Sequence, residues 1–398
     1  MPSEFQAATS AARAAAPLFP GFFLAGFECS DHVLRDGRRL DLLASTRHDE
    51  LAASDYARLN SLGITTCREG VSWVRCEPRA ANYDFSSLRP RLSAARGRVQ
   101  LIWDIMHFGW PDHVDVFAAD FPEHFAAYAR ALASFLAREG QAPFIFTPIN
   151  EMSFLAWAGG DVARMNPFAE GRGVELKAQL VAATIEAIDE IRQLLPESRF
   201  LQAEPLIHIA GDPARPETWP AAAAEAQAQY QALDMLAGRH WRRLGGSPAH
   251  LDIVGLNFYP DNQFTRERET VWLGDVRYRP LSDMLMEAYE HYGRRPIVIS
   301  ETGAEGADRA PWLRYVADQC VVALERGCEL HGVTLYPIVD HPGWLDDRHC
   351  PNGLWSYPDT DGSRLSDPAL AAELRQQAPR LLAARTAMLA RRRRQLEG

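Results

Sequence analysis

Eight short apolar, β-prone runs alternate with helix-forming stretches along this chain of 398 residues, and that alternation is what most limits its possible folds. The runs cover 21–27, 63–69, 98–106, 142–150, 199–204, 251–259, 295–301 and 331–339. Stretches rich in Ala, Leu, Glu and Arg separate them, near 49–62, 86–96, 121–138, 173–195, 220–243, 281–292 and 310–326, and a last one begins at 367. Strands that alternate with helices in this way are typical of a parallel sheet covered by helices.

Two architectures accommodate this order, a closed barrel and an open doubly wound sheet. The open sheet usually has a Gly-rich phosphate-binding turn, G-x-G-x-x-G, after its first strand, whereas this chain has GFECSD. The chain exceeds the usual single-core size of about 250 to 300 residues, but barrels often grow past that limit as one domain. We therefore predict an α/β fold with a single (β/α)8 TIM barrel over residues 20–366. An N-terminal extension at 1–19 and a C-terminal helix with a basic tail at 367–398 would flank it.

Composition and charge exclude several kinds of partner. The chain has 47% hydrophobic and 24% charged residues, as expected of a globular protein with a sizeable core. Its net charge of -10 argues against a nucleic-acid partner, and the one basic run, 391–394, is interpreted as a solvated helix end. Because neither a secretion-signal core nor 18 consecutive apolar residues occur, we expect no membrane partner and a cytoplasmic location. A homo-oligomer, formed through the terminal extensions, stays open.

Neither the cysteines nor the histidines have the spacing of a metal site. The six cysteines include no C-x-x-C pair, so we expect reduced and mostly buried thiols. The twelve histidines include no H-E-x-x-H, and His107, His113 and His124 are too far apart in the sequence to share one helical face. We predict no metal and no cofactor.

Polar residues close most of the predicted strands. They are Arg68 and Glu69, His107, Asn150 and Glu151, Glu204, Asn257 and Tyr259, and Glu301. In a TIM barrel the carboxyl ends of the strands surround one active site, so these side chains are expected to share a pocket. Any single one could instead cap a helix or pair with a neighbour. Glutamate is a poor strand former and costly to bury, so Glu151 and Glu301 in particular predict a chemical use.

Several motifs, in a consistent order, resemble those of the family 1 glycoside hydrolases, the β-glucosidase and β-galactosidase type. TPINEM is similar to the family's T-F-N-E-P, and VISETGA to its I-T-E-N-G-A. CREGVSWVRCEP follows its Y-R-F-S-I-S-W-S-R-I-x-P, IVGLNFY its F-I-G-I-N-Y-Y, and NYDFSSL its Y-D-F-S-S-L. With FLAGF near the start and PNGLWSY near the end, the resemblance spans residues 20 to 357 and implies a barrel glycosidase.

The resemblance implies a retaining mechanism with Glu151 as the acid/base and Glu301 as the nucleophile, roughly 5 to 5.5 Å apart. Cleavage of an acetal independently calls for one protonated and one ionised carboxyl group. By the match, Arg68 and Tyr259 would hold Glu301 ionised and aimed, because a guanidinium lowers the pKa of a neighbouring carboxyl.

Further substrate-binding roles carry over by position. Asn150 would donate to the sugar 2-hydroxyl, His107 would face the 3-hydroxyl, and Asn257 would shape the site. Of the aromatic residues in the predicted loops, Trp344 is expected to pack on the sugar ring. The partner is thus expected to be a small carbohydrate or glycoside.

Departures from the family pattern predict an atypical sugar subsite. Gly343 stands where the family's L-x-D-N-F-E-W has its second acidic residue, and Phe108 replaces the tryptophan of H-W-D. The position at which the family has a glutamine after strand one corresponds to about His32 or Val33 in this chain, so that glutamine is missing. The roles of Glu28, Glu69 and Glu204 stay open, although Glu69 should point away from the pocket if Arg68 points in. A catalytically inactive sugar-binding or partner-binding barrel, and a transglycosidase, are the alternatives.

Overall fold

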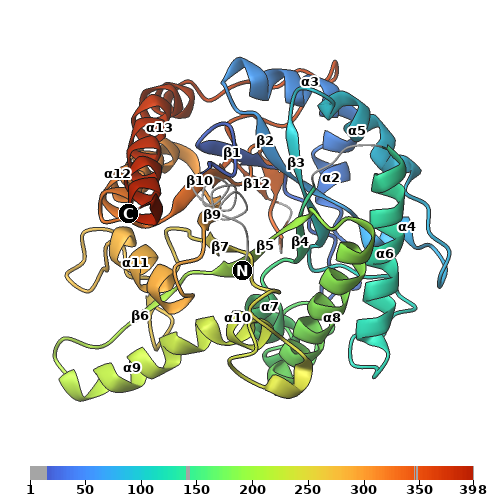
Figure 1. Ribbon diagram of the computed structural model, residues 1–398, viewed down its shortest axis with the longest axis horizontal. Helices are drawn as coiled ribbons and strands as arrows, with labels where there is room; N and C mark the ends of the chain where they lie inside the picture. Colours follow the sequence, from blue (N-terminus) through green and yellow to red (C-terminus); the bar gives the residue numbers. More distant parts are fainter. Residues whose placement is uncertain (1–15, 140–143, 345, 347, 398) are drawn as a thin grey trace.

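Eight parallel strands close into a barrel in the computed structural model, which describes residues 16–139, 144–344, 346 and 348–397 (Figure 1). The order around the barrel is β1-β10-β9-β7-β5-β4-β3-β2. The strands are β1 (Phe23–Gly26), β2 (Thr66–Gly70), β3 (Gln100–Met106), β4 (Ile145–Ile149), β5 (Arg199–Pro205), β7 (Ile253–Asn257), β9 (Ile297–Thr302) and β10 (Leu330–Leu335). Each falls within or next to one of the eight predicted runs, and the predicted TIM barrel is confirmed.

Helices surround the barrel as the alternation predicts. The long ones are α3 (His48–Ser61), α5 (Arg89–Ala95), α6 (Phe121–Glu139), α8 (Gly173–Leu194), α11 (Leu281–His291), α12 (Arg309–Glu325) and α13 (Pro368–Glu397). In α6, Phe121, Phe125, Leu132 and Leu136 are buried at helical spacing, so one apolar stripe faces the sheet. The predicted helix over 220–243 is instead broken into α9 (Trp219–Ala226), a 3-10 turn and α10 (Gln231–Leu236).

Short elements in the loops complete the carboxyl end of the barrel. They are α2 (Leu42–Ser45), α4 (Trp73–Cys76), α7 (Met152–Leu155), β6 (His208–Ala210), β8 (Gln263–Thr265), β11 (His341–Pro342) and β12 (His349–Cys350). None of them is long enough to show a hydrophobic period in the sequence.

Two apolar layers hold the fold together. One lies inside the barrel, where every other strand residue points inward, and contains Phe19, Leu24, Ile102, Ile145, Leu201, Ile253 and Val298. The other, larger layer lies between the sheet and the helices. The interior is therefore packed with side chains at the amino ends of the strands, and the polar residues lie at their carboxyl ends.

The C-terminal helix α13 packs beside α12, as the red and orange ribbons of Figure 1 show. Its Arg385 is buried and donates hydrogen bonds to the carbonyl oxygens of Gly21 (2.8 Å) and His331 (2.9 Å). Most of the predicted N-terminal extension, residues 1–15, lies outside the described residues. All six cysteines are buried and free. Among the described residues, no helix is both long and apolar enough to cross a membrane.

Candidate active site

Arg68 lies at the centre of the polar residues that close the strands. It points into the barrel from β2, and its guanidinium donates to Glu301 Oε1 (2.6 Å), Asp104 Oδ2 (2.6 Å) and Asn150 Oδ1 (2.6 Å). Its side chain is 1% exposed, so these interactions take place away from water and fix the positions of all three partners. One arginine thus connects strands β2, β3, β4 and β9.

Glu301 lies on β9 and is held from both sides. Its Oε1 accepts from Arg68, and its Oε2 accepts the phenolic hydrogen of Tyr259 at 2.8 Å. Burial raises the pKa of Glu301, while Arg68 and Tyr259 oppose that rise. The lowering that the sequence predicts from Arg68 is therefore present, but burial outweighs it in the net shift.

Glu151 follows β4 at the start of α7 and has a left-handed backbone conformation, with φ 44°. Such a conformation is uncommon for a residue with a side chain, and it is kept here by the surrounding hydrogen bonds. The Glu151 N–H donates to the carbonyl of Ala203 at 2.9 Å, and the Asn257 amide donates to Glu151 Oε1 at 2.8 Å. Burial, reinforced by the negative charge of Glu301, raises the pKa of Glu151 to about 8.

Asn257 connects the two glutamates. It ends β7 and is the register partner of Glu301 on β9, while its side chain donates to Glu151. Ser300 donates to Asn257 Oδ1 at 2.6 Å. This hydrogen bond fixes the orientation of the amide, so that its Nδ2 points at Glu151. Asn257 therefore holds Glu151 next to the strand that carries Glu301, and the negative charge of Glu301 raises the pKa of Glu151.

His107 and Asn150 continue the hydrogen-bonded chain from Arg68. The Asn150 oxygen accepts from Arg68, and its Nδ2 lies 3.1 Å from His107 Nε2. The N–H at His107 Nδ1 donates to Asp104 Oδ2, 2.8 Å away. Asp104 was not among the predicted site residues, although a carboxylate inside the apolar run LIWDIM, two positions after the inward-facing Ile102, is a usable signal.

Trp344 lies half-buried at the rim among other rings. Its ring centre is 5.0 Å from that of His32, 5.6 Å from that of Phe108 and 6.3 Å from that of Phe154. Phe108 and Phe154 follow β3 and β4, so loops from three parts of the chain form this apolar rim. Phe154 was not anticipated, because nothing in its local sequence distinguishes it from a core residue.

Glu28 follows β1 and lies in the same region. Its Oε1 is 3.9 Å from His107 Nε2 and accepts from the Ser30 N–H at 3.1 Å. Burial alone would raise the pKa of Glu28, but His107 and His341 outweigh burial and lower it. An ionised carboxylate therefore lies beside His107.

Glu69 and Glu204 lie outside the cavity. Glu69 points away from the barrel interior, as strand alternation predicts, and binds His48, Tyr56 and Arg91 in the helix layer. Glu204 accepts from the Ser153 N–H (3.1 Å) and so caps α7, the short helix that Glu151 precedes. Its negative charge also contributes to the raised pKa of Glu151.

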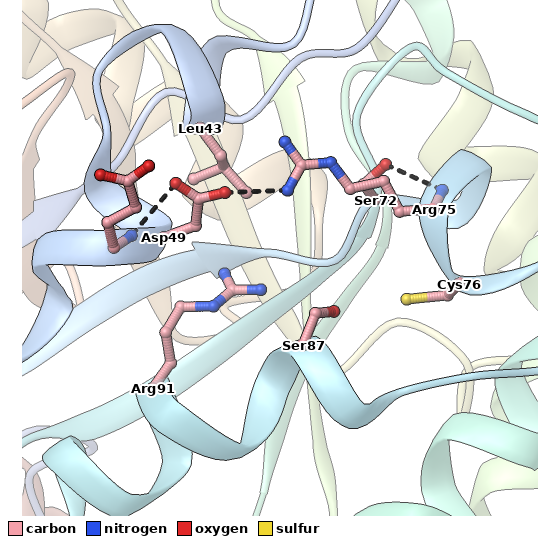
Figure 2. Close-up of a pocket in the computed structure, with 8 residues that line it drawn as sticks. Leu43, Asp49, Ser72, Arg75, Cys76, Ser87 and Arg91 are labelled. Carbon is pink, nitrogen blue, oxygen red and sulfur yellow. Dashed lines mark hydrogen bonds and ion pairs between the residues drawn. The ribbon is translucent and has the colours of Figure 1, made fainter.

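Two further cavities are separate from the glutamate pair. One, of about 160 Å³, lies outside the barrel, where Arg75 binds Asp49 and Arg91 extends from α5 (Figure 2). The other, of about 570 Å³, lies between β6, α9 and α11. Neither glutamate lines either cavity.

The chemistry available to the pair follows from its asymmetry. Arg68 and Tyr259 stabilise negative charge on Glu301 alone, whereas Glu151 retains a proton up to about pH 8. Arg68 thus favours the ionised form of Glu301 relative to that of Glu151, and two carboxyl groups that differ in this way can act as nucleophile and acid toward the same bond.

Comparison with solved structures identifies similar folds. A β-glucosidase from Thermotoga maritima in complex with methoxycarbonyl-substituted glucoimidazole aligns with a TM-score of 0.72 and 14% identity, covering 93% of this chain and 99% of that one. A family 1 β-glucosidase from Thermotoga maritima aligns with a TM-score of 0.71 and 14% identity over the same shares. The AHE enzyme from Alicyclobacillus herbarius aligns with a TM-score of 0.69 and 18% identity, covering 85% of this chain and 88% of that one.

At these identities the likeness establishes the fold, which is that of family 1 β-glucosidases. No family model matches the chain. No curated protein matches it in sequence either.

Proposed function

We propose that this chain is a retaining β-glycosidase of the family 1 glycoside hydrolase type, acting on a small β-linked glycoside. The observation that carries the proposal is the asymmetry of the glutamate pair. Asn257 links Glu151 to the strand of Glu301, and of the two glutamates Arg68 binds Glu301 and not Glu151. The barrel over residues 20–366 would be the catalytic domain.

In the first step Glu151 donates its proton to the glycosidic oxygen while a Glu301 oxygen attacks the anomeric carbon. The bond to the leaving group breaks, and a covalent glycosyl-enzyme forms on Glu301. Glu151, now ionised, then takes a proton from water as that water attacks the same carbon, which releases the sugar and restores Glu301 as a carboxylate. The raised pKa of Glu151 suits a group that must donate and then accept a proton.

The supporting residues would bind the sugar. Asn150 and His107 lie next to Arg68 in one hydrogen-bonded chain, so their positions are fixed before substrate arrives. Trp344 would pack on the sugar ring from the rim. Asn257 would hold Glu151, and Tyr259 would aim Glu301.

The sugar subsite would be atypical because of its acidity. Gly343 offers no side chain where the family pattern has a carboxylate, while the ionised Glu28 lies beside His107. A carboxylate at this position favours a sugar that presents several donors or a cationic group. Amino sugars therefore belong in a substrate panel together with glucosides and galactosides.

The test is release of phenol from aryl β-glycosides of glucose, galactose and glucosamine, followed by trapping with the matching activated 2-fluoro glycosides, or with a 5-fluoro glycoside where the 2-amino group must be kept. We expect a label on the peptide that contains Glu301, and a fall in kcat of roughly a thousandfold or more in Glu301→Gln. Glu305→Gln, which alters an exposed carboxylate four residues away, is the matched control. Wild-type protein that binds sugars but cleaves none, or a label on another residue, would refute the proposal.

A further inference from the structure

A second set of chemically active side chains converges outside the barrel mouth. Glu77 follows α4, His113 lies in the loop between β3 and α6, and His124 lies in the first turn of α6. Both histidines direct Nε2 at the same oxygen, Glu77 Oε1, at 2.6 Å for His124 and 3.4 Å for His113. One donor atom from each residue lies within 4.8 Å of the other two.

Hydrogen bonding alone does not account for this convergence. Glu77 Oε1 already accepts the Ala81 N–H at 2.9 Å, and a carboxylate oxygen has two lone pairs. With His124 in place, the oxygen has no well-directed lone pair left for His113. A cation among the three side chains would use all of their donor atoms at once.

The carboxylate is prepared as a ligand. Its side chain is fully buried, and its other oxygen accepts the Trp73 indole N–H at 2.6 Å. An outer hydrogen bond of this kind is what usually orients the carboxylates that bind metals.

The donor set selects the class of ion. Two imidazole nitrogens and one carboxylate oxygen suit Zn²⁺ and similar divalent transition metals, which bind such sets with water in a remaining position. The histidine side chains are 30% and 25% exposed, so an ion can reach them from solvent. We propose that Glu77, His113 and His124 form a binding site for one divalent transition-metal ion of the Zn²⁺ class.

A different triad, Cys29, Asp104 and His107, also brings its donor atoms within 4.8 Å of one another. It is a poorer site because Asp104 already binds the Arg68 guanidinium. In addition, Cys29, Asp104 and His107 are all buried, so an ion reaches them from solvent less readily than it reaches His113 and His124.

The position of the proposed site indicates a structural role. The loop between β3 and α6 carries His107 and Phe108 of the candidate active site at one end and His113 further along. An ion that joins His113 to α4 and α6 would reduce the motion of this loop. The site does not depend on the proposed glycosidase activity.

The test uses the full-length, untagged protein after dialysis against a chelator. Titration calorimetry with Zn²⁺ should give one equivalent, and Co²⁺ should develop visible d–d absorption without a thiolate charge-transfer band. Single variants His113→Ala, His124→Ala and Glu77→Gln should each weaken binding roughly a hundredfold or more. His240→Ala, which removes an exposed histidine elsewhere, should bind as the wild type does.

Three results would overturn the proposal. They are the absence of saturable binding below roughly millimolar Zn²⁺ or Co²⁺, binding that survives all three substitutions, and a thiolate band, which would place the ion at Cys29. Circular dichroism of each variant establishes that it is folded. Glu77→Gln keeps the shape of the side chain, so at least one variant separates loss of the ligand from loss of the fold.

Discussion

At the scale of single residues, Arg68 gives the glutamate pair its asymmetry. It binds Glu301 directly, and it reaches His107 through Asn150 and Asp104. Glu151 instead accepts from the neutral amide of Asn257, and the negative charges of Glu301 and Glu204 raise its pKa. The same buried surroundings therefore favour charge on one acid and a proton on the other.

Tyr259 provides a specific test of how Glu301 is held. In Tyr259→Phe the carboxylate loses the 2.8 Å hydrogen bond on Oε2, and its pKa should rise further because burial is less well opposed. We expect kcat/KM on an aryl glycoside to fall about 10- to 100-fold and its acidic limb to move to higher pH. Tyr83→Phe, in the outer layer, is the control. An unchanged acidic limb would contradict the role given to Tyr259.

Glu151 determines the expected behaviour at alkaline pH. Because its pKa is raised to about 8 and its acid form is the active one, kcat/KM should decline as pH rises through about 8. Glu151→Gln should remove this limb for aryl glycosides whose leaving group departs without a proton, and should nearly abolish turnover of alkyl glycosides. A basic limb that persists in the variant would assign the limb to another group.

Strand ends and motifs predicted which residues gather at the candidate site better than they predicted the pKa shifts of those residues. Strand-end position and motif together identified Arg68, Asn257 and Glu301, because these residues follow recognisable strands. Asp104 was missed since it lies inside a strand, and its partner Arg68 is 36 positions away. The direction of the pKa shift of Glu301 could not be predicted from the sequence either, because it depends on how completely the fold buries this side chain.

At the scale of secondary-structure elements, β2 serves two networks, one on each face. Arg68 faces the cavity, and Glu69 faces α3, where it binds His48 Nε2 at 2.8 Å. His48 Nδ1 lies 2.8 Å from Asp55, which in turn binds Arg364 from the C-terminal segment. Both ring nitrogens of His48 face carboxylates, so the buried ring carries both protons.

This network predicts a pH-dependent stability. Burial alone would lower the pKa of His48, but Glu69 and Asp55 outweigh it and raise the pKa above its ordinary value. Because the folded pKa is the higher one, the stabilisation is complete below about pH 6.5 and is lost as pH rises through the folded pKa. His48→Gln should therefore lower the free energy of unfolding by about 3 to 5 kcal/mol at pH 6, and by less at high pH.

Urea unfolding of wild type and His48→Gln across this pH range measures the difference. His240→Gln, at an exposed position, should track the wild type. A difference that stays constant as pH rises would show that His48 contributes by packing alone.

The elements themselves were largely predictable, with instructive exceptions. The barrel strands are almost entirely buried, so most of them give an apolar run that stands out in the sequence, although β2 and β5 also contain buried charged residues. The stretch 220–243 is rich in Ala and Gln and was predicted as one helix, yet it breaks near Gln227. Propensity favours a helix there, but packing of Gln229 against the Ile207 backbone decides the outcome.

At the scale of the whole molecule, the C-terminal helix α13 connects to the amino ends of two neighbouring barrel strands through one buried arginine. Arg385 reaches from α13 to the backbone before β1 and to β10, strands that are neighbours in the barrel although far apart in the sequence. Its side chain also lies over the ring of Phe22, 5.6 Å from the ring centre. Nothing in the local sequence of α13 indicates this contact, because it exists only once the barrel has closed.

Two opposing effects meet at Arg385, and one substitution tells which is larger. Burial lowers the pKa of Arg385 to about 10, which reflects the cost of keeping its charge away from water. Against that cost stand the carbonyl oxygens of Gly21 and His331, which would lose their donor in Arg385→Met. We expect the lost hydrogen bonds to dominate and the free energy of unfolding to fall by about 1 to 3 kcal/mol, measured by urea unfolding. Arg393→Met, on the exposed part of α13, should change the free energy of unfolding little. If Arg385→Met is instead more stable than the wild type, burying the charge costs more free energy than its hydrogen bonds contribute.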